Sequence, residues 1–333
     1  MKPRIEIKHL TPQIARLTSF WLAVVTYWIY QSFATDLDIA DADSRSFPNE
    51  ILEGRAPSPY RYRIGAPLLA RVVEMVPGVG TGAAHKWVML LAFVVLFESF
   101  RSICNLLGLS LTQQFAASCF LVAPLVLTFQ VTLYTPWAIV EASLLCLSTQ
   151  LLLTRTQLGL LALALSIWSL TRETVAFFLF ALILLSLLRA TRTRFPLRRT
   201  VALVGPPLAV QFVLRLVWPG PAPYRSISVR EVFEYNIEGV VGGAIAVSLL
   251  APLFALACAE AYFARKAGSF GPIHTLWLGI AFANFGGFLV FAIWWETRVL
   301  IPAIVMSALM SAKFFTRIET SRSTAIGVVQ SRE

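Results

Sequence analysis

Long apolar stretches separated by short polar segments dominate the pattern of this sequence. The longer stretches approach the roughly 20 residues of helix that are needed to cross about 30 Å of hydrocarbon. The pattern predicts ten membrane spans, at residues 15–33, 84–103, 112–134, 136–154, 157–170, 172–188, 200–218, 240–262, 273–293 and 299–316. We therefore expect an all-α, polytopic membrane protein in which residues 1–333 form a single transmembrane domain.

The distribution of basic residues indicates how these spans are oriented. Five arginines lie within the segment from Arg189 to Arg199, between two apolar stretches. Loops with such an excess of Lys and Arg stay in the cytoplasm. With an even number of spans, both termini are expected on the same, cytoplasmic side. Most acidic residues then fall on the extracytoplasmic face.

Two loops on that outer face are long, at residues 34–83 and 219–239. Inside the first loop, the apolar residues of segment 67–76 recur with helical spacing. The segment begins with Pro67, a residue suited to the first turn of a helix. We expect this segment to form an interfacial helix that lies flat at the membrane surface. The second loop is too short to fold as a separate domain.

The composition supports a membrane protein and argues against several other classes. Hydrophobic residues make up 57% of the chain and charged residues only 14%, and the mean hydropathy is +0.71. The net charge of +10 would suggest nucleic-acid binding in a soluble protein, but here the cytoplasmic loops account for it, and no nucleic-acid partner is expected. The four cysteines form no CxxC motif, which disfavours a zinc site or a disulfide framework.

An acidic motif follows the first predicted span directly. Asp41 and Asp43 are two residues apart, so in an extended chain their carboxylates point to the same side. Such a pair can hold a divalent cation, Mg²⁺ or Mn²⁺, or supply one carboxylate as a general base. The alternative is a solvated acidic loop.

Arg61 and Arg63, each preceded by a tyrosine, come shortly before the expected interfacial helix. The planar guanidinium group donates paired hydrogen bonds to phosphate oxygens, so these residues suit a lipid phosphate or pyrophosphate at headgroup height. General binding of anionic lipid is the alternative.

Three further charged positions lie within or between predicted spans. Glu141 is about one turn inside a span, where a carboxylate is costly and usually faces a polar cavity or a cation. Arg172 and Glu173 interrupt an apolar block at a tight outer turn, where Arg172 can meet a lipid phosphate. The alternative is that this turn belongs to a structural ion-pair network with Glu141 or Glu296. We favour this structural role for Glu173 more than for Arg172.

Before the last span, Glu296 and Arg298 follow two adjacent tryptophans. Tryptophans there can stack on a sugar ring, but an ordinary belt of aromatic residues at the membrane interface also explains them.

In its plan and in these local strings the chain resembles the polytopic glycosyltransferases of the GT-C class, which take a sugar from a polyprenyl-phosphate carrier at the outer membrane face. The strings are Asp41-Ala-Asp43, Tyr60-Arg-Tyr-Arg63, Thr171-Arg-Glu173 and Glu296-Thr-Arg298. The resemblance implies that Asp41 or Asp43 is the catalytic carboxylate or a metal ligand. It also implies that arginines such as Arg172 or Arg298 bind the carrier phosphate.

The resemblance implies a polyprenyl-phosphate-linked sugar and membrane lipids as partners, and the chain is expected in a bacterial plasma (inner) membrane. It is expected to depart from many members of the class in having no C-terminal soluble domain, and it spaces its acidic pair as D-x-D. A transporter or flippase of an anionic lipid-linked substrate is an alternative, as is a non-catalytic membrane subunit. The predicted spans have few charges near their centres, whereas a transporter holds its substrate midway across the membrane, so the enzyme is favoured.

Overall fold

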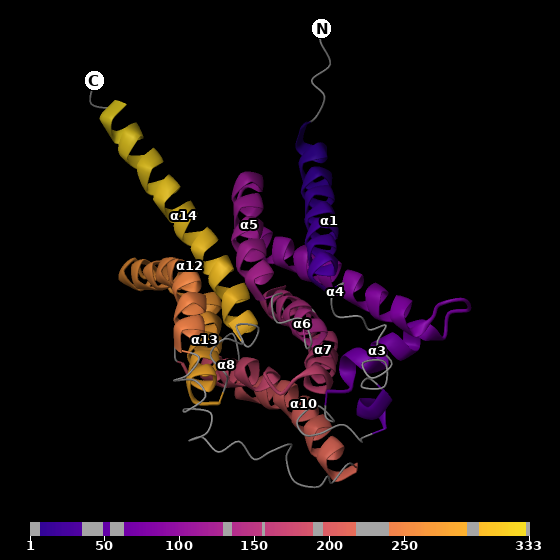
Figure 1. Ribbon diagram of the computed structural model, residues 1–333. Helices are drawn as coiled ribbons and strands as arrows, with labels where there is room; N and C mark the ends of the chain where they lie inside the picture. Colours follow the sequence, from indigo (N-terminus) through magenta and orange to yellow (C-terminus); the bar gives the residue numbers. More distant parts are fainter. Residues whose placement is uncertain are drawn as a thin grey trace.

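The computed structural model of the chain describes residues 7–34, 49–53, 63–128, 135–154, 157–188, 196–217, 240–291 and 300–330. Over these residues the structure is helical and contains no strand (Figure 1). The helices are α1 (Ile7–Ala34), α3 (Gly65–Glu74), α4 (Thr81–Leu106), α5 (Leu111–Thr128), α6 (Thr135–Thr154), α7 (Leu158–Thr171), α8 (Val175–Leu187), α10 (Leu197–Val217), α12 (Val240–Lys266), α13 (Pro272–Phe291) and α14 (Ile301–Gln330).

Each predicted span coincides with a helix, and the predicted interfacial segment coincides with α3. The largest differences are at the ends. Helix α1 begins eight residues before its predicted span, at Ile7, and α14 continues to Gln330, well past residue 316. An apolar stretch shows only which part of a helix is suited to an apolar environment. The backbone hydrogen bonds of a helix do not require apolar side chains, so the helix can continue into polar sequence.

Three of the described helical stretches are long and apolar enough to cross a membrane: Thr81–Leu106, Leu197–Val217 and Ile301–Glu319. Four further apolar stretches are shorter, at Leu111–Val126, Ala138–Thr154, Leu158–Thr171 and Val175–Leu187. These lengths and compositions are compatible with a membrane protein. The full number of ten spans and the cytoplasmic position of both termini stay predictions.

The helices pack in a continuous series. Helix α4 packs against α1 and α6, α6 against α7, and α7 against α10, while α14 packs against α5, α12 and α13, and α13 also packs against α8. In Figure 1, α1, α5 and α14 extend toward the same side of the molecule, while α4 and α10 run across the view below them. Helix α6 lies among α4, α7 and α14, and nearly every side chain from Ala138 to Leu152 is buried.

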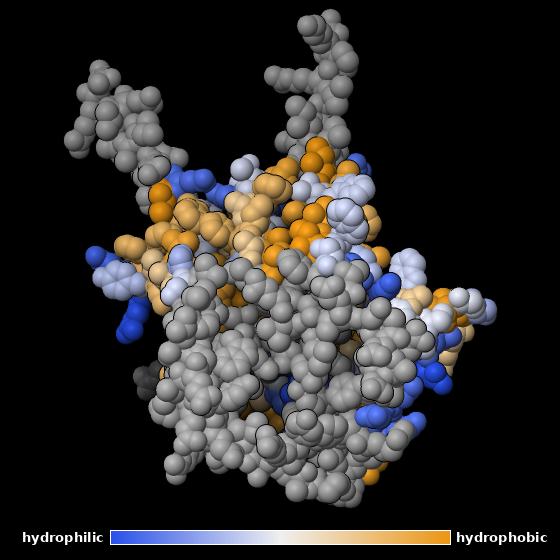
Figure 2. Space-filling model, in the orientation of Figure 1, coloured by the Kyte–Doolittle hydropathy of each residue, from blue (hydrophilic) through white to orange (hydrophobic). Residues whose placement is uncertain are grey.

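Large apolar side chains occupy both the interior and the outside. Phe93, Phe97, Phe100 and Trp168 are fully buried in the core. Others remain exposed on outward faces, among them Trp28 of α1 and Phe212 of α10. Figure 2 shows hydrophobic side chains spread over the described helices of one face, with hydrophilic side chains mainly near its edges. An apolar exterior of this kind suits contact with lipid.

Helix α3 is docked onto α7 by a glycine. A Cβ atom at Gly65 would lie 3.0 Å from the carbonyl carbon of Leu170 and from the nitrogen of Thr171, and it would also collide with the Thr171 hydroxyl. The absence of a side chain therefore lets the start of α3 touch the backbone at the end of α7. The opposite face of α3 leaves Leu68 and Val72 exposed, as expected for an interfacial helix.

Candidate functional site

Four predicted site residues meet where α3, α6, α7 and α8 come together. Glu141 is on α6, Arg172 and Glu173 form the turn between α7 and α8, and Arg63 precedes α3. With Thr174 they form a group that we name the Arg172 cluster. Because these residues come from three separate parts of the sequence, the helix packing assembles the group.

Two ion pairs hold the Arg172 cluster together. A terminal nitrogen of Arg172 donates to Glu141 Oε2 at 2.6 Å, and the Thr174 hydroxyl donates to the other oxygen of the same carboxylate. Arg63 Nε donates to Glu173 Oε2 at 3.2 Å. The cluster contains two arginines and two glutamates, so their formal charges cancel.

The local sequence explains why these polar groups lie together at the turn between α7 and α8. Arg172 ends α7 in an extended conformation, with φ −157° and ψ 150°, while its N–H still donates to the carbonyl of Trp168 at 2.8 Å. Helix α8 begins at Val175, so only three polar residues separate two strongly apolar helices. The turn therefore places Arg172, Glu173 and Thr174 at the edge of the apolar core.

Burial makes the first pair energetically important. Glu141 is fully buried, and Arg172 is only 7% exposed. A charge left alone in such surroundings keeps its desolvation penalty, so loss of one partner typically costs about 3–5 kcal/mol. Arg172 Nε and Glu173 Oε1 are also buried and have no hydrogen-bond partner in the part of the chain that the structure describes. The cluster thus holds its charges in place but leaves one donor and one acceptor unused.

An ion pair of a different kind lies at the other end of α3. Arg71 donates to Glu74 Oε2 at 2.7 Å, and the Arg71 side chain is 64% exposed and that of Glu74 13%, so we call it the exposed pair after its arginine. Burial by itself would raise the pKa of Glu74, but hydrogen bonds from Arg71 and Thr81 and the charges of Arg71 and His85 hold that pKa below its ordinary value. This exposed pair is a natural control for the buried one.

The structure answers part of what the sequence left open. It brings Arg63, Glu141, Arg172 and Glu173 together, and it pairs Arg172 as well as Glu173, so the preference for Glu173 as the paired residue was incomplete. The other predicted site residues lie outside the described residues: Asp41, Asp43, Arg61, Glu296 and Arg298. Their roles stay predictions, and so does a divalent cation at Asp41 and Asp43. Among the residues that the structure describes, no group of three or more His, Cys, Asp and Glu side chains is arranged to hold a metal ion.

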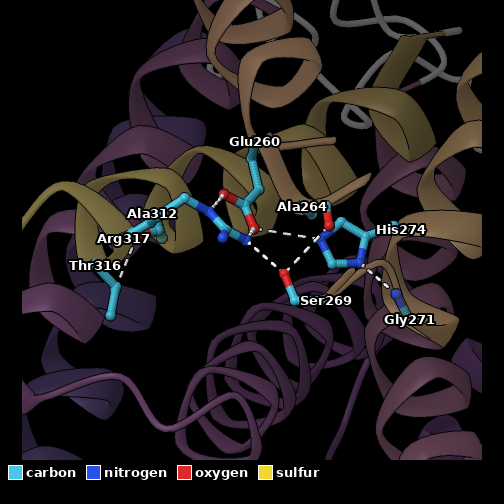
Figure 3. A network of polar contacts seen from close by, with 8 residues as sticks. All are labelled: Glu260, Ala264, Ser269, Gly271, His274, Ala312, Thr316 and Arg317. Carbon is cyan, nitrogen blue, oxygen red and sulfur yellow. Dashed lines mark hydrogen bonds and ion pairs between the residues drawn. The ribbon is translucent and has the colours of Figure 1, made fainter. Parts of the chain in front are cut away.

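A second polar network, which sequence reasoning missed, joins α12, α13 and α14 (Figure 3). Arg317 donates to both oxygens of the buried Glu260, each at 2.8 Å, and also to the Ser269 hydroxyl at 3.2 Å. His274 Nε2 lies 3.3 Å from Glu260 Oε1, and His274 Nδ1 accepts a hydrogen bond from the Gly271 N–H at 2.9 Å. We name these residues the Glu260 network.

The hydrogen bonds assign the tautomer of His274. Because Nδ1 accepts from a backbone N–H, it carries no proton, so the proton is on Nε2 and points to the carboxylate of Glu260. The imidazole is therefore neutral and is already engaged on both sides. This arrangement connects the loop between α12 and α13 to α14, and we interpret it as structural.

Sequence reasoning missed the Glu260 network because Arg317 lies 57 residues from Glu260 along the chain, and only helix packing brings it to the carboxylate. The one available signal was Glu260 itself, an acidic residue inside a long apolar stretch. The buried Glu260 belongs to a separate group of helices that includes none of the helices of the Arg172 cluster.

Comparison with known proteins gives no relative for this chain. No family model matches it, and no curated protein and no solved structure matches it significantly.

Proposed function

We propose that this chain is a membrane glycosyltransferase of the GT-C type, which moves a sugar from a polyprenyl-phosphate carrier to an acceptor at the extracytoplasmic face of a bacterial plasma membrane. The Arg172 cluster is the proposed site for the carrier phosphate. In this proposal both termini are cytoplasmic, and the cluster lies at the outer ends of α6 and α7.

The observation that carries the proposal is the position of Arg172. Its guanidinium group is nearly buried at the end of an apolar helix, it is fixed by Glu141, and its Nε–H has no acceptor among the described residues. Planar N–H groups in a water-poor setting match phosphate oxygens well. Arg63 pairs with Glu173, the residue next to Arg172, and so adds a second guanidinium group to the cluster.

The chemistry requires a base and a stabilised leaving group. In the proposed reaction Asp41 or Asp43 accepts the proton of an acceptor hydroxyl, whose oxygen bonds to the anomeric carbon of the sugar. The bond between that carbon and the carrier phosphate oxygen breaks, and the electron pair leaves with the phosphate. Arg172 and Arg63 stabilise the negative charge that develops there.

The direct test measures sugar transfer by the full-length protein in lipid nanodiscs. The nanodiscs contain a polyprenyl phosphate that carries a labelled sugar. We expect Arg172→Gln and Arg63→Gln to weaken carrier binding, because a lost hydrogen bond to a charged phosphate typically costs about 1.5–3 kcal/mol. Asp41→Asn or Asp43→Asn should abolish transfer while the protein still binds the carrier. Arg71→Gln, in the exposed pair of α3, is the matched control and should behave like the wild type.

The assignment would be wrong if the wild-type protein retained only bulk anionic lipids, such as phosphatidylglycerol, and no polyprenyl-phosphate species. It would also be wrong as to the catalytic motif if both aspartate variants kept full activity.

A transporter or flippase for an anionic lipid-linked substrate is the second candidate. The observation that favours it is the pair Pro206 and Pro207 inside the continuous helix α10, because prolines weaken a helix and transporters often build substrate sites at broken helices. Movement of a fluorescent lipid-linked substrate across a sealed vesicle, without sugar transfer, would favour this candidate over the enzyme.

A further inference from the structure

Two buried N–H groups at the end of α7 have no acceptor in the described part of the chain. One is the indole Nε1 of Trp168, whose residue is 1% exposed, and the other is Nε of Arg172. A buried donor without a partner typically costs about 1–3 kcal/mol, so such groups are rare in folded proteins. Two of them in one turn of helix call for a common explanation.

The two donors belong to neighbouring residues on the helix, and both side chains are held in place. The backbone N–H of Arg172 donates to the carbonyl of Trp168, so the residues lie one helical turn apart. The indole packs against Phe178 of α8, with ring centroids 5.6 Å apart, and the guanidinium group is held by Glu141 at 2.6 Å. Both side chains are therefore already ordered before an acceptor binds.

The chemistry of the donors defines what they can bind. An indole N–H and a guanidinium N–H only donate hydrogen bonds, so their common partner must supply acceptor oxygens. The charge of Arg172 is already balanced by Glu141, which limits what net charge can contribute to binding an anion. Directed hydrogen bonds must then provide much of the affinity, and the uncharged indole is suited to this role. By contrast, the Glu260 network has its principal groups paired with one another.

We infer that Trp168 is a phosphate-binding residue, and that its Nε1–H acts together with Arg172 Nε–H to hold oxygens of the phosphate of a lipid-linked substrate. This inference rests on the proposed function and adds to it a residue that the sequence pattern did not single out. The paired donors also fix the orientation of the phosphate, because two hydrogen bonds from one turn of helix restrict its rotation.

The experiment compares two tryptophans that differ in one respect. Trp277 is buried like Trp168, but its Nε1 donates to the Ser307 hydroxyl at 2.9 Å. Replacement by phenylalanine keeps an aromatic ring and removes the N–H together with the five-membered ring of the indole, so both variants leave a similar small cavity in the core. Without added carrier lipid, both variants should lower Tm because of this cavity, and Trp277→Phe should lower it more, because Ser307 also loses its donor. Trp168→Phe should lower Tm less, because the donor that it removes has no partner among the described residues.

The second readout is affinity for polyprenyl monophosphate in nanodiscs, with free polyprenol and phosphatidylglycerol as comparison lipids. We expect Trp168→Phe to weaken binding of polyprenyl monophosphate roughly tenfold or more and to leave the weak binding of polyprenol unchanged. Trp277→Phe should bind like the wild type.

The inference is overturned if Trp168→Phe lowers Tm by as much as Trp277→Phe does and keeps wild-type affinity for polyprenyl monophosphate, since the indole N–H is then paired within the fold. An equal loss of phosphatidylglycerol binding also overturns it, in favour of an ordinary lipid site. If the wild type binds and transfers sugar while Trp168→Phe does the same, only this inference fails. If the wild type does not bind polyprenyl monophosphate at all, the proposed function fails with it.

Discussion

Arg172 is held in apolar surroundings by a single buried carboxylate, that of Glu141. The attraction between such charges is strong, but each has lost its hydration, so the pair is stable mainly in comparison with either charge left alone. Two kinds of ion pair in this protein therefore have to be distinguished: the buried pair of the Arg172 cluster and the exposed pair of Arg71 and Glu74.

A double-mutant cycle tests this distinction. Glu141→Gln and Arg172→Gln should each lower the free energy of unfolding by about 3–5 kcal/mol, because each leaves the other charge buried and unpaired. The double variant should lose less than the sum of the two. In the exposed pair, Arg71→Gln and Glu74→Gln should each cost no more than about 1 kcal/mol. Denaturation of the purified protein in detergent gives these values, and strict additivity at the buried pair would contradict the interpretation.

His274 offers a second test at the residue scale. Asparagine can place an acceptor near the position of Nδ1 and so keep the hydrogen bond from Gly271, whereas leucine keeps neither contact. We expect His274→Leu to lower the free energy of unfolding by about 1–3 kcal/mol and His274→Asn to lower it clearly less. Thermal unfolding of both variants measures the difference, and equal losses would show that the Gly271 contact does not matter.

At the scale of the elements, the periodicity of the sequence was a good guide to the helices and a poor guide to their contacts. Residues 67–76 predicted an amphipathic helix, and α3 has that character. The amphipathic pattern does not say which helix lies against its buried face. That is decided by Gly65, whose missing side chain admits the backbone of α7.

Gly65→Ala should therefore destabilise the protein by about 1–3 kcal/mol, because the added methyl group overfills a contact that includes backbone atoms. It should also disturb the pair of Arg63 and Glu173, which lies beside this contact. Gly159 is in the first turn of α7, and apart from its own helix backbone no described atom lies within 4 Å of an added Cβ. Gly159→Ala is the matched control, and we expect it to be neutral or to stabilise the protein by up to about 1 kcal/mol.

Thermal unfolding and carrier binding should be measured on both glycine variants. If Gly65→Ala is as harmless as Gly159→Ala, then α3 does not depend on close contact with α7.

At the scale of the whole molecule, the central prediction is orientation in the membrane. The described ends of α1 and α14 extend toward the same side in Figure 1, in keeping with an even number of crossings. Which side faces the cytoplasm follows from the arginine-rich segment from Arg189 to Arg199 and from the preference of such segments for the cytoplasm.

Labelling of introduced cysteines tests the orientation. In a background without the four native cysteines, Ser226→Cys should react with an impermeant maleimide in intact bacterial cells. Thr193→Cys should react only after the membrane is opened, because the neighbouring arginines keep its loop in the cytoplasm. The reverse pattern would invert the topology, and labelling of both positions in intact cells would contradict the number of spans between them.

The sequence by itself determined the helical class, the approximate place of each helix and the amphipathic character of α3, because these depend on local apolar length and spacing. It also singled out Glu141, Arg172 and Glu173, because a charge inside apolar sequence is visible without a structure. Only the tertiary structure decided the partners: Arg172 with Glu141, Arg63 with Glu173, and Glu260 with His274 and Arg317. Partners depend on which helices pack together, and helix packing depends on three-dimensional shape that local patterns do not record.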